Sequence, residues 1–179
     1  MMILWIVLSA VGGIIVLVLL IAAVMKKGYA IERSIVVDKP LDETFHFVSS
    51  IETQNSWSKW ATMDPNIKTT YLGTDRTVGF VSKWESDAKN VGHGEQEIKK
   101  IIPNERMETE MRFLKPMRSV AYGYFNTSAV GENQTKVAWG FTGNFPYPFN
   151  IMMLFMDMEG MLGKDFEEGL TNMKKMIEK

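Results

Sequence analysis

The sequence contains no cysteine, and this absence removes several kinds of chemistry at once. Disulfide bridges, thiolate metal sites and cysteine nucleophiles are excluded, but the redox compartment stays open because cysteine-free proteins occur on both sides of a membrane. Histidine is scarce as well, with only His46 and His93 present. Two histidines without cysteine cannot build a standard structural zinc site, so we expect no metal site. The same scarcity gives little support to histidine catalysis.

The sequence also lacks the short motifs of nucleotide-dependent and serine-dependent enzymes. It has no P-loop, dinucleotide fingerprint or serine elbow, and the Gly92-His93-Gly94 turn is too short to cradle a phosphate. A formal net charge of −1 argues against a general nucleic-acid binder, which would carry a basic face. No cofactor is implied, and no catalytic residue can be named from the sequence.

Charged residues are missing from the first 25 positions. Residues 3–25 form one apolar run that spans roughly 35 Å as a helix, enough to cross a hydrocarbon core of about 30 Å. A cleaved signal peptide should have a basic front and an apolar run of only about 7–15 residues, and this run meets neither condition. We therefore predict a transmembrane anchor over residues 1–27 and one soluble domain over residues 28–179.

Lys26 and Lys27 follow the apolar run, and no basic residue precedes it. Positive residues flanking a membrane span favour the cytoplasmic side. The pattern therefore predicts a single-pass protein of the inner (cytoplasmic) membrane whose soluble domain lies in the cytoplasm.

The soluble domain alternates apolar and polar residues in a series of short segments separated by turn signals. A β-rich first segment is followed by a short helix over residues 41–50 and a helix or loop with large rings over residues 53–65. The segments predicted as strands cover residues 30–37, 68–72, 78–85, 94–102, 106–114, 119–129 and 134–142. The charge-rich strands near residues 95–112 are typical of a solvated outer sheet face, where ion pairs contribute little.

After residue 148 the apolar spacing changes to three and four. We predict a long helix from about Ile151 to the chain end, with Asn150 as its N-cap and one apolar stripe along its length. Seven of the fourteen methionines fall in this segment. Gly160 and Gly163 weaken a helix, which indicates close packing or a bend there. Consecutive strands indicate an antiparallel sheet, and this helix is the element long enough to cover it.

This order of elements resembles the START-like, or helix-grip, superfamily, which includes pollen-allergen proteins and bacterial polyketide cyclase/dehydrase-like (SRPBCC) proteins. The resemblance covers about residues 29–179 and is carried by IERSIVVDKPLDETFHFV, NSWSKWATMDP, TVGFVSKWES, GEQEIKKIIPNER, NQTKVAWGFTG and GKDFEEGLTNMKK. It implies an α+β helix-grip fold, with a curved antiparallel sheet of about 6–7 strands around a long C-terminal helix. In relatives, the cavity between sheet and helix holds lipids, sterols or polyketides.

Large aromatic and methionine side chains are the candidates for lining such a cavity. The residues that we select are Trp57, Trp60, Phe80, Trp84, Met111, Tyr122, Trp139, Met152, Phe155 and Met156. Methionine is flexible and suits a wall that admits variable apolar ligands, but it also fills gaps in ordinary cores, as aromatic rings do. Trp57 and Trp60 are the best candidates for the cavity mouth, because the helical pattern lapses around them.

The leading hypothesis is a membrane-tethered domain that binds a hydrophobic small molecule, of the lipid or isoprenoid kind. One alternative is a cyclase- or hydrolase-like enzyme, in which pocket shape folds the substrate and one or two polar groups move protons. Another is a protein-interaction module whose groove receives a partner segment. The sequence favours a binding protein over an enzyme without deciding between them.

Overall fold

The computed structural model describes all 179 residues, which form two compact units. Unit 1 comprises Met1–Tyr29 and Asn144–Met158. Unit 2 comprises Ala30–Gly143 and Glu159–Lys179, and it contains nearly all of the sheet.

The sheet has seven strands in the order β1-β7-β6-β5-β4-β3-β2. From β2 to β7 each strand pairs antiparallel with the next one along the chain, and β7 then lies beside β1. The strands are β1 (Gly28–Val37), β2 (Lys68–Leu72), β3 (Val81–Glu85), β4 (His93–Ile102), β5 (Arg106–Lys115), β6 (Ser119–Gly131) and β7 (Gln134–Asn144). The predicted antiparallel sheet and α+β class are confirmed.

Alternation along the strands gives the sheet an inner and an outer face. On β7, Val137, Trp139 and Phe141 are buried, and on β5 the buried positions are Met107, Thr109 and Met111. Side chains of a strand point to opposite faces with a period of two, so these residues share the inner face. The residues between them on β5 are charged and lie on the outer face, as predicted for the charge-rich strands.

Four helices belong mainly to unit 2: α2 (Leu41–Val48), α3 (Ile51–Trp57), α4 (Lys59–Thr62) and α5 (Met158–Ile177). The predicted helix-or-loop segment is thus two short helices, α3 and α4. The side chain of Ser50 caps α3 by accepting a hydrogen bond from the Thr53 amide at 2.9 Å.

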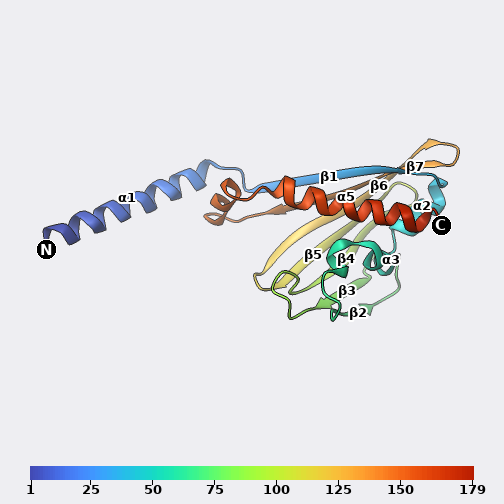
Figure 1. The fold of residues 1–179 in the computed structure, drawn as a ribbon, viewed down its shortest axis with the longest axis horizontal. Helices are drawn as coiled ribbons and strands as arrows, with labels where there is room; N and C mark the ends of the chain where they lie inside the picture. Colours follow the sequence, from blue (N-terminus) through green and yellow to red (C-terminus); the bar gives the residue numbers. More distant parts are fainter. The chain divides into compact units, whose positions relative to one another are not determined.

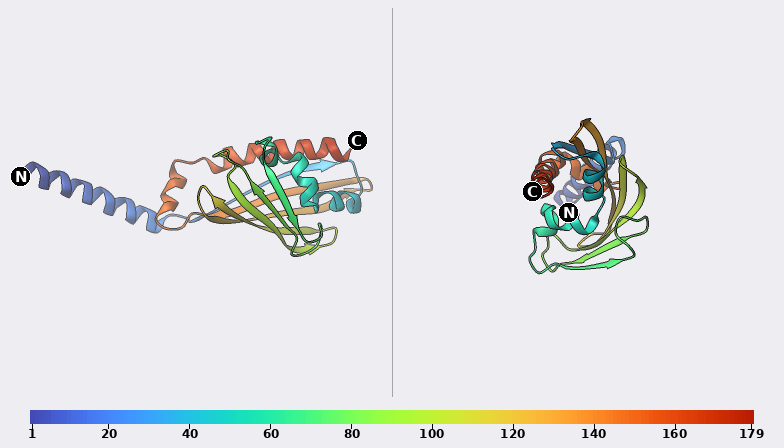
Figure 2. Two further views of the ribbon diagram at one scale, coloured as in Figure 1. Left: turned by 90° about the horizontal axis from the view of Figure 1, so that it is seen from below. Right: turned by 90° about the vertical axis from the view of Figure 1, so that its right-hand side faces the viewer.

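The long helix α5 turns Phe166, Leu170, Met173 and Ile177 into the core at spacings of four, three and four. Figure 1 shows β1 and β7 running alongside α5. In Figure 2, α5 and the short helices lie on the same side of the sheet. This arrangement agrees with the helix-grip fold.

Unit 1 is built on α1 (Met2–Val24), which is long and apolar enough to cross a membrane. The second element of the unit is the short 3-10 helix η1 (Phe149–Leu154). The helix expected over residues 3–25 is present, with bounds that differ by a single residue at each end.

The prediction of one continuous helix from Ile151 to the chain end is wrong. The segment forms η1, then a break at residues 155–157, then α5 from Met158. Asn150 does not cap this helix, because its side-chain amide donates to the backbone oxygens of Ala22 at 2.7 Å and Met25 at 3.4 Å. The methionines of α5 are therefore only Met158, Met161, Met173 and Met176; Met152, Met153 and Met156 lie outside it.

Candidate functional site

Six aromatic rings meet on the inner face of unit 2, and we call them the aromatic cluster: Trp57, Trp60, Phe125, Trp139, Phe141 and Phe166. Trp139 of β7 lies parallel to Phe166 of α5, with ring centroids 4.3 Å apart. Trp57 meets Trp139 edge-to-face at 5.3 Å, and Trp60 meets Phe166 in the same way at 5.2 Å. Rings from α3, α4, β6, β7 and α5 thus form one apolar centre, as expected from the preference of aromatic pairs for offset or edge contacts.

A glycine allows α5 to approach the sheet at this point. A Cβ atom on Gly169 would lie 2.8 Å from Cζ3 of Trp139, closer than real contacts allow. Gly163, one of the two glycines expected to mark close packing, lies against the guanidinium of Arg33 on β1, and no Cβ would fit there without moving that group. The helix is therefore seated on β1 and β7 at positions where it has no side chain.

Polar contacts hold α4 against α5. The indole N–H of Trp60 donates to Asp165 Oδ2 at 3.1 Å. Lys59 lies 2.7 Å from Glu168 and 2.9 Å from Asp165, and these hydrogen bonds, the one to Glu168 first, raise the pKa of its ammonium group. These ion pairs connect the Trp60 segment to α5.

Trp57 is different, because its indole N–H is buried and has no hydrogen-bond partner. The side chain is only 2% exposed and lies edge-on to Phe125 and Trp139. Most buried polar groups in folded proteins are hydrogen-bonded, so an unpaired donor at the centre of the inner face calls for an explanation.

Polar side chains surround α3 where it faces strands β3 to β5, and we call them the amide layer: Gln54, Asn55, Ser82, Gln96 and Thr109. Gln96 donates to the side-chain oxygens of Gln54 and Thr109, each at 3.3 Å. Asn55 donates to Ser82 at 3.4 Å. The amide layer lines the same face as the aromatic cluster, so the inner face is apolar near α5 and polar beneath α3.

A second ring contact lies at the end of β3, β4 and β5. Trp84 meets Phe113 edge-to-face at 5.8 Å, and both rings are partly exposed. Gly94 lies opposite Trp84 in the strand pairing, and the indole occupies the space where a Cβ would stand. This end of the inner face therefore keeps two large apolar rings that are not fully covered.

Six of the ten predicted ligand residues face inward in unit 2. Trp57, Trp60 and Trp139 belong to the aromatic cluster, and Trp84 and Met111 lie on the inner face of β3 and β5. The sixth, Phe80, is 1% exposed and stacks on Tyr71. Whether any of these residues touches a ligand stays a prediction.

The other four predicted residues lie elsewhere. Tyr122 points to the outer face of β6 and is 50% exposed, since Ala121 and Gly123 take the inner positions. A Cβ on Gly123 would lie 3.0 Å from Met111 Cε and Thr109 Oγ1, so little room is left for a side chain at this inner position. The remaining three, Met152, Phe155 and Met156, belong to unit 1.

Sequence reasoning did not select Phe125, Phe166 or the amide layer. Phe166 lay on the recognised apolar stripe of the last helix, so a signal was present for its burial. The sequence did not indicate that Gln54 and Gln96 face inward, because their direction depends on how α3 docks on β4.

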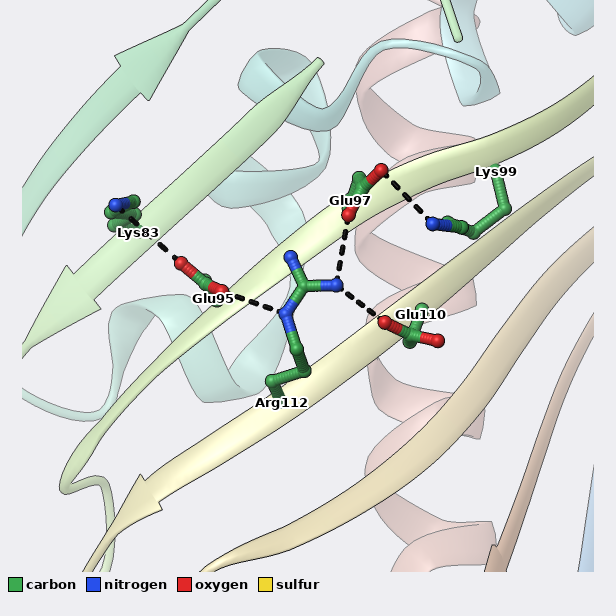
Figure 3. A network of polar contacts seen from close by, with 6 residues as sticks. All are labelled: Lys83, Glu95, Glu97, Lys99, Glu110 and Arg112. Carbon is green, nitrogen blue, oxygen red and sulfur yellow. Dashed lines mark hydrogen bonds and ion pairs between the residues drawn. The ribbon is translucent and has the colours of Figure 1, made fainter. Parts of the chain in front are cut away.

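The outer face carries an ion-pair network centred on Arg112 of β5 (Figure 3). Its guanidinium contacts Glu95 at 2.6 Å, Glu97 at 2.8 Å, and Glu110. The hydrogen bond from Arg112 is the main reason that the pKa values of Glu95 and Glu97 lie below their usual range. These groups face away from the aromatic cluster. They therefore connect β4 and β5 on the outer face and do not contact a ligand on the inner face.

No group of three or more acidic or histidine side chains is arranged to hold a metal ion. A surface hollow of about 300 Å³ lies where the β3–β4 turn meets the end of β5, lined by residues that include Ser86, Lys89, His93 and Lys115. It is open to solvent, and no residue of the aromatic cluster lines it.

Several solved structures share this fold at low sequence identity. A solution structure from Thermobifida fusca is 14% identical, with a TM-score of 0.61, 83% of this chain covered and 92% of the other. A norcoclaurine synthase from Thalictrum flavum, in complex with dopamine and hydroxybenzaldehyde, is 10% identical, with a TM-score of 0.60 and coverages of 84% and 86%. A crystal structure of a Chromobacterium violaceum protein is 12% identical, with a TM-score of 0.58 and coverages of 84% and 99%.

Among curated proteins, no sequence matches this chain. The family model described as "polyketide cyclase / dehydrase and lipid transport" matches residues 29–178, which is nearly the whole chain beyond α1. Together with the antiparallel sheet that α5 covers on one side, this match confirms the resemblance to the helix-grip superfamily. The chain belongs to the polyketide cyclase/dehydrase and lipid transport family.

Proposed function

We propose that this protein is a membrane-tethered binding domain for a hydrophobic small molecule, of the lipid or isoprenoid kind. The ligand would lie on the inner face of the sheet, between the strands and helices α3 to α5. The family description, which names lipid transport, supports the ligand class. The observation that carries the proposal is the buried, unpaired indole N–H of Trp57 within the aromatic cluster.

The chemistry of the inner face suggests what the ligand looks like. The aromatic cluster and the pair Trp84 and Phe113 offer apolar surface to a hydrocarbon body. Leaving a buried donor unpaired costs about 1–3 kcal/mol, which a ligand oxygen accepting from Trp57 would recover. The amide layer lies next to α3 and adds neutral polar groups but no buried charge. A mostly apolar molecule with one hydroxyl or carbonyl oxygen fits this face best.

The tether suits such a ligand, because molecules of this kind reside in membranes rather than in water. The helix α1 would act as the span, and Lys26 and Lys27 would hold the domain at the cytoplasmic face. Only Met25, Lys26 and Lys27 separate α1 from β1, so the start of β1 stays within a short chain length of the bilayer.

Native mass spectrometry of the full chain, released from lipid nanodiscs, tests the proposal. We expect an adduct that survives loss of the annular lipids and that extraction identifies as an apolar molecule carrying an oxygen group. Removing one hydrogen bond weakens binding by about threefold to tenfold, so Trp57→Phe should lower the occupied fraction accordingly. Trp5→Phe, in α1, is the matched control and should leave occupancy unchanged.

Two results would count against the proposal. A chain that never retains an adduct beyond annular lipid would argue against any binding function. Equal occupancy in Trp57→Phe and Trp5→Phe would show that the buried indole N–H does not select the ligand.

A further inference from the structure

The segment between β7 and α5 presents an unusual row of exposed apolar side chains in unit 1. Between residues 144 and 156 the chain carries no charged residue. The exposed members are Tyr147 (46%), Phe149 (57%), Met152 (41%), Leu154 (58%) and Phe155 (85%). Isolated apolar residues are normal on protein surfaces, but a contiguous row with three aromatic rings marks a surface that meets something apolar.

The same segment is fastened to the C-terminal end of α1. The side chain of Asn150 is fully buried, and its amide donates to the backbone oxygen of Ala22 at 2.7 Å and to that of Met25 at 3.4 Å. The last carbonyls of a helix have no partner within the helix, so Asn150 caps the end of α1. Figure 2 shows η1 beside this end of α1.

Two further contacts strengthen the attachment. The Phe145 amide donates to the Lys27 oxygen at 2.8 Å, and the rings of Tyr29 and Phe145 lie 5.8 Å apart. Ala22, in the last turns of α1, is fully buried, whereas most of α1 is exposed. The segment is thus attached at the level where a membrane span would leave the hydrocarbon core.

We propose that residues 146–156 dock into the lipid headgroup–acyl boundary beside α1, with Asn150 as the clasp that holds them there. The inference rests on the proposed role of α1 as a membrane span. Aromatic side chains such as Tyr147, Phe149 and Phe155 favour the membrane interface. Lys26 and Lys27 supply positive charge at the same level, which complements anionic lipid headgroups. Phe155, on this reading, faces lipid rather than a ligand cavity.

The occupant of the exposed row is therefore the bilayer itself. A lipid interface accounts for three features of this row: it has no charged residue, it contains aromatic rings, and it is attached to the end of the apolar helix. Apolar side chains of this kind reach about 5–10 Å into the boundary region of a bilayer. Unit 1 would then meet the bilayer at two neighbouring points, α1 and this segment.

The absence of cysteine makes a direct test possible with the full chain. Single cysteines at Phe155, Ile14 and Lys136 would each carry a nitroxide spin label, in nanodiscs of phosphatidylcholine and phosphatidylglycerol. Power-saturation measurements compare label access to oxygen, which is enriched in lipid, with access to a water-soluble nickel complex. Ile14 reports on the span, and Lys136, exposed on β7, is the reference for water.

We expect the Phe155→Cys label to show severalfold higher oxygen-to-nickel access than the Lys136→Cys label, at a shallower depth than the Ile14→Cys label. Water-like access at position 155 with a lipid-buried label at position 14 would overturn the docking inference and leave the tether intact. Water-like access at position 14 would overturn both.

A second variant tests the clasp without altering the exposed row. Asn150→Leu removes the donor to Ala22 and Met25 while keeping a similar volume. A label at Leu154 should gain nickel access in this background, because the segment loses its attachment to α1. An unchanged depth would overturn the role of Asn150.

Discussion

Replacing Gly169 with alanine places one methyl group against the buried ring of Trp139. The new Cβ would lie 2.8 Å from Trp139 Cζ3 and 3.6 Å from Trp57. Trp139 cannot move aside easily, because Phe166 stacks on it at 4.3 Å and Phe125 at 5.4 Å. The indole is 3% exposed, so it lies inside the packed core rather than at the surface. The helix and the sheet must therefore separate slightly or distort.

Two effects of opposite sign decide the magnitude. Alanine in place of a helical glycine stabilises by about 1 kcal/mol. Overpacking a tight core costs about 1–3 kcal/mol, so Gly169→Ala should lose about 1 kcal/mol net. The matched control is Gly163→Ala on the same helix, where the Cβ meets the end of the Arg33 side chain. That guanidinium is flexible and its ion pairs are at the surface, so the control should be as stable as the native chain or more so.

Urea unfolding of the full chain in a mild detergent, followed by tryptophan fluorescence and near-ultraviolet circular dichroism, measures this difference. For a slope of about 2 kcal/mol per molar urea, Gly169→Ala should lower the midpoint by about 0.5 M. Trp5 in α1 stays within the micelle and contributes a constant signal. If Gly169→Ala proved as stable as Gly163→Ala, Trp139 would have room to move, and the packing argument would be refuted.

Three further outcomes follow from the structure. Phe166→Ala should lower the free energy of unfolding by about 3–5 kcal/mol, because the ring is fully buried. Met161→Ala, on the exposed side of α5, should change it little, and similar losses in both variants would contradict the assigned helix faces. Arg112→Gln should destabilise the protein at neutral pH, and the difference from the native chain should shrink as pH falls below about 4.5. The folded-state pKa values of Glu95 and Glu97 are depressed, so their stabilisation is present above the unfolded value and is lost on acidification through the folded value; a pH-independent difference in urea unfolding would refute this origin. Fluorescent-protein and alkaline-phosphatase fusions to the C-terminus should report a cytoplasmic end, and an active phosphatase would reverse the predicted topology.

Much of the fold could be predicted because its signals are local. The turn before β7 and the alternation of Val137, Trp139 and Phe141 identified the β6–β7 hairpin, and β2 falls at the predicted residues. Tyr122 shows where local pattern failed: a large ring was taken to face inward, but the inner positions beside it hold Ala121 and Gly123. The small size of Gly123 matters because Met111 and Thr109 of the neighbouring strand lie close to it, and the sequence of β6 alone does not show this.

The sequence alone determined those elements that form because of the residues within their own segment. An uninterrupted apolar run favours a helix wherever it meets lipid, and the stripe of Phe166, Leu170 and Met173 defines the buried side of α5 without reference to its partner. Tertiary structure decided what depends on distant partners. Asn150 would cap a helix by local rules, but its side chain instead binds the Ala22 oxygen, 128 positions away, and the helix begins later. Likewise, only the docking of α3 on the sheet buries the Trp57 indole N–H without an acceptor, because hydrogen-bond satisfaction is a property of the assembled core.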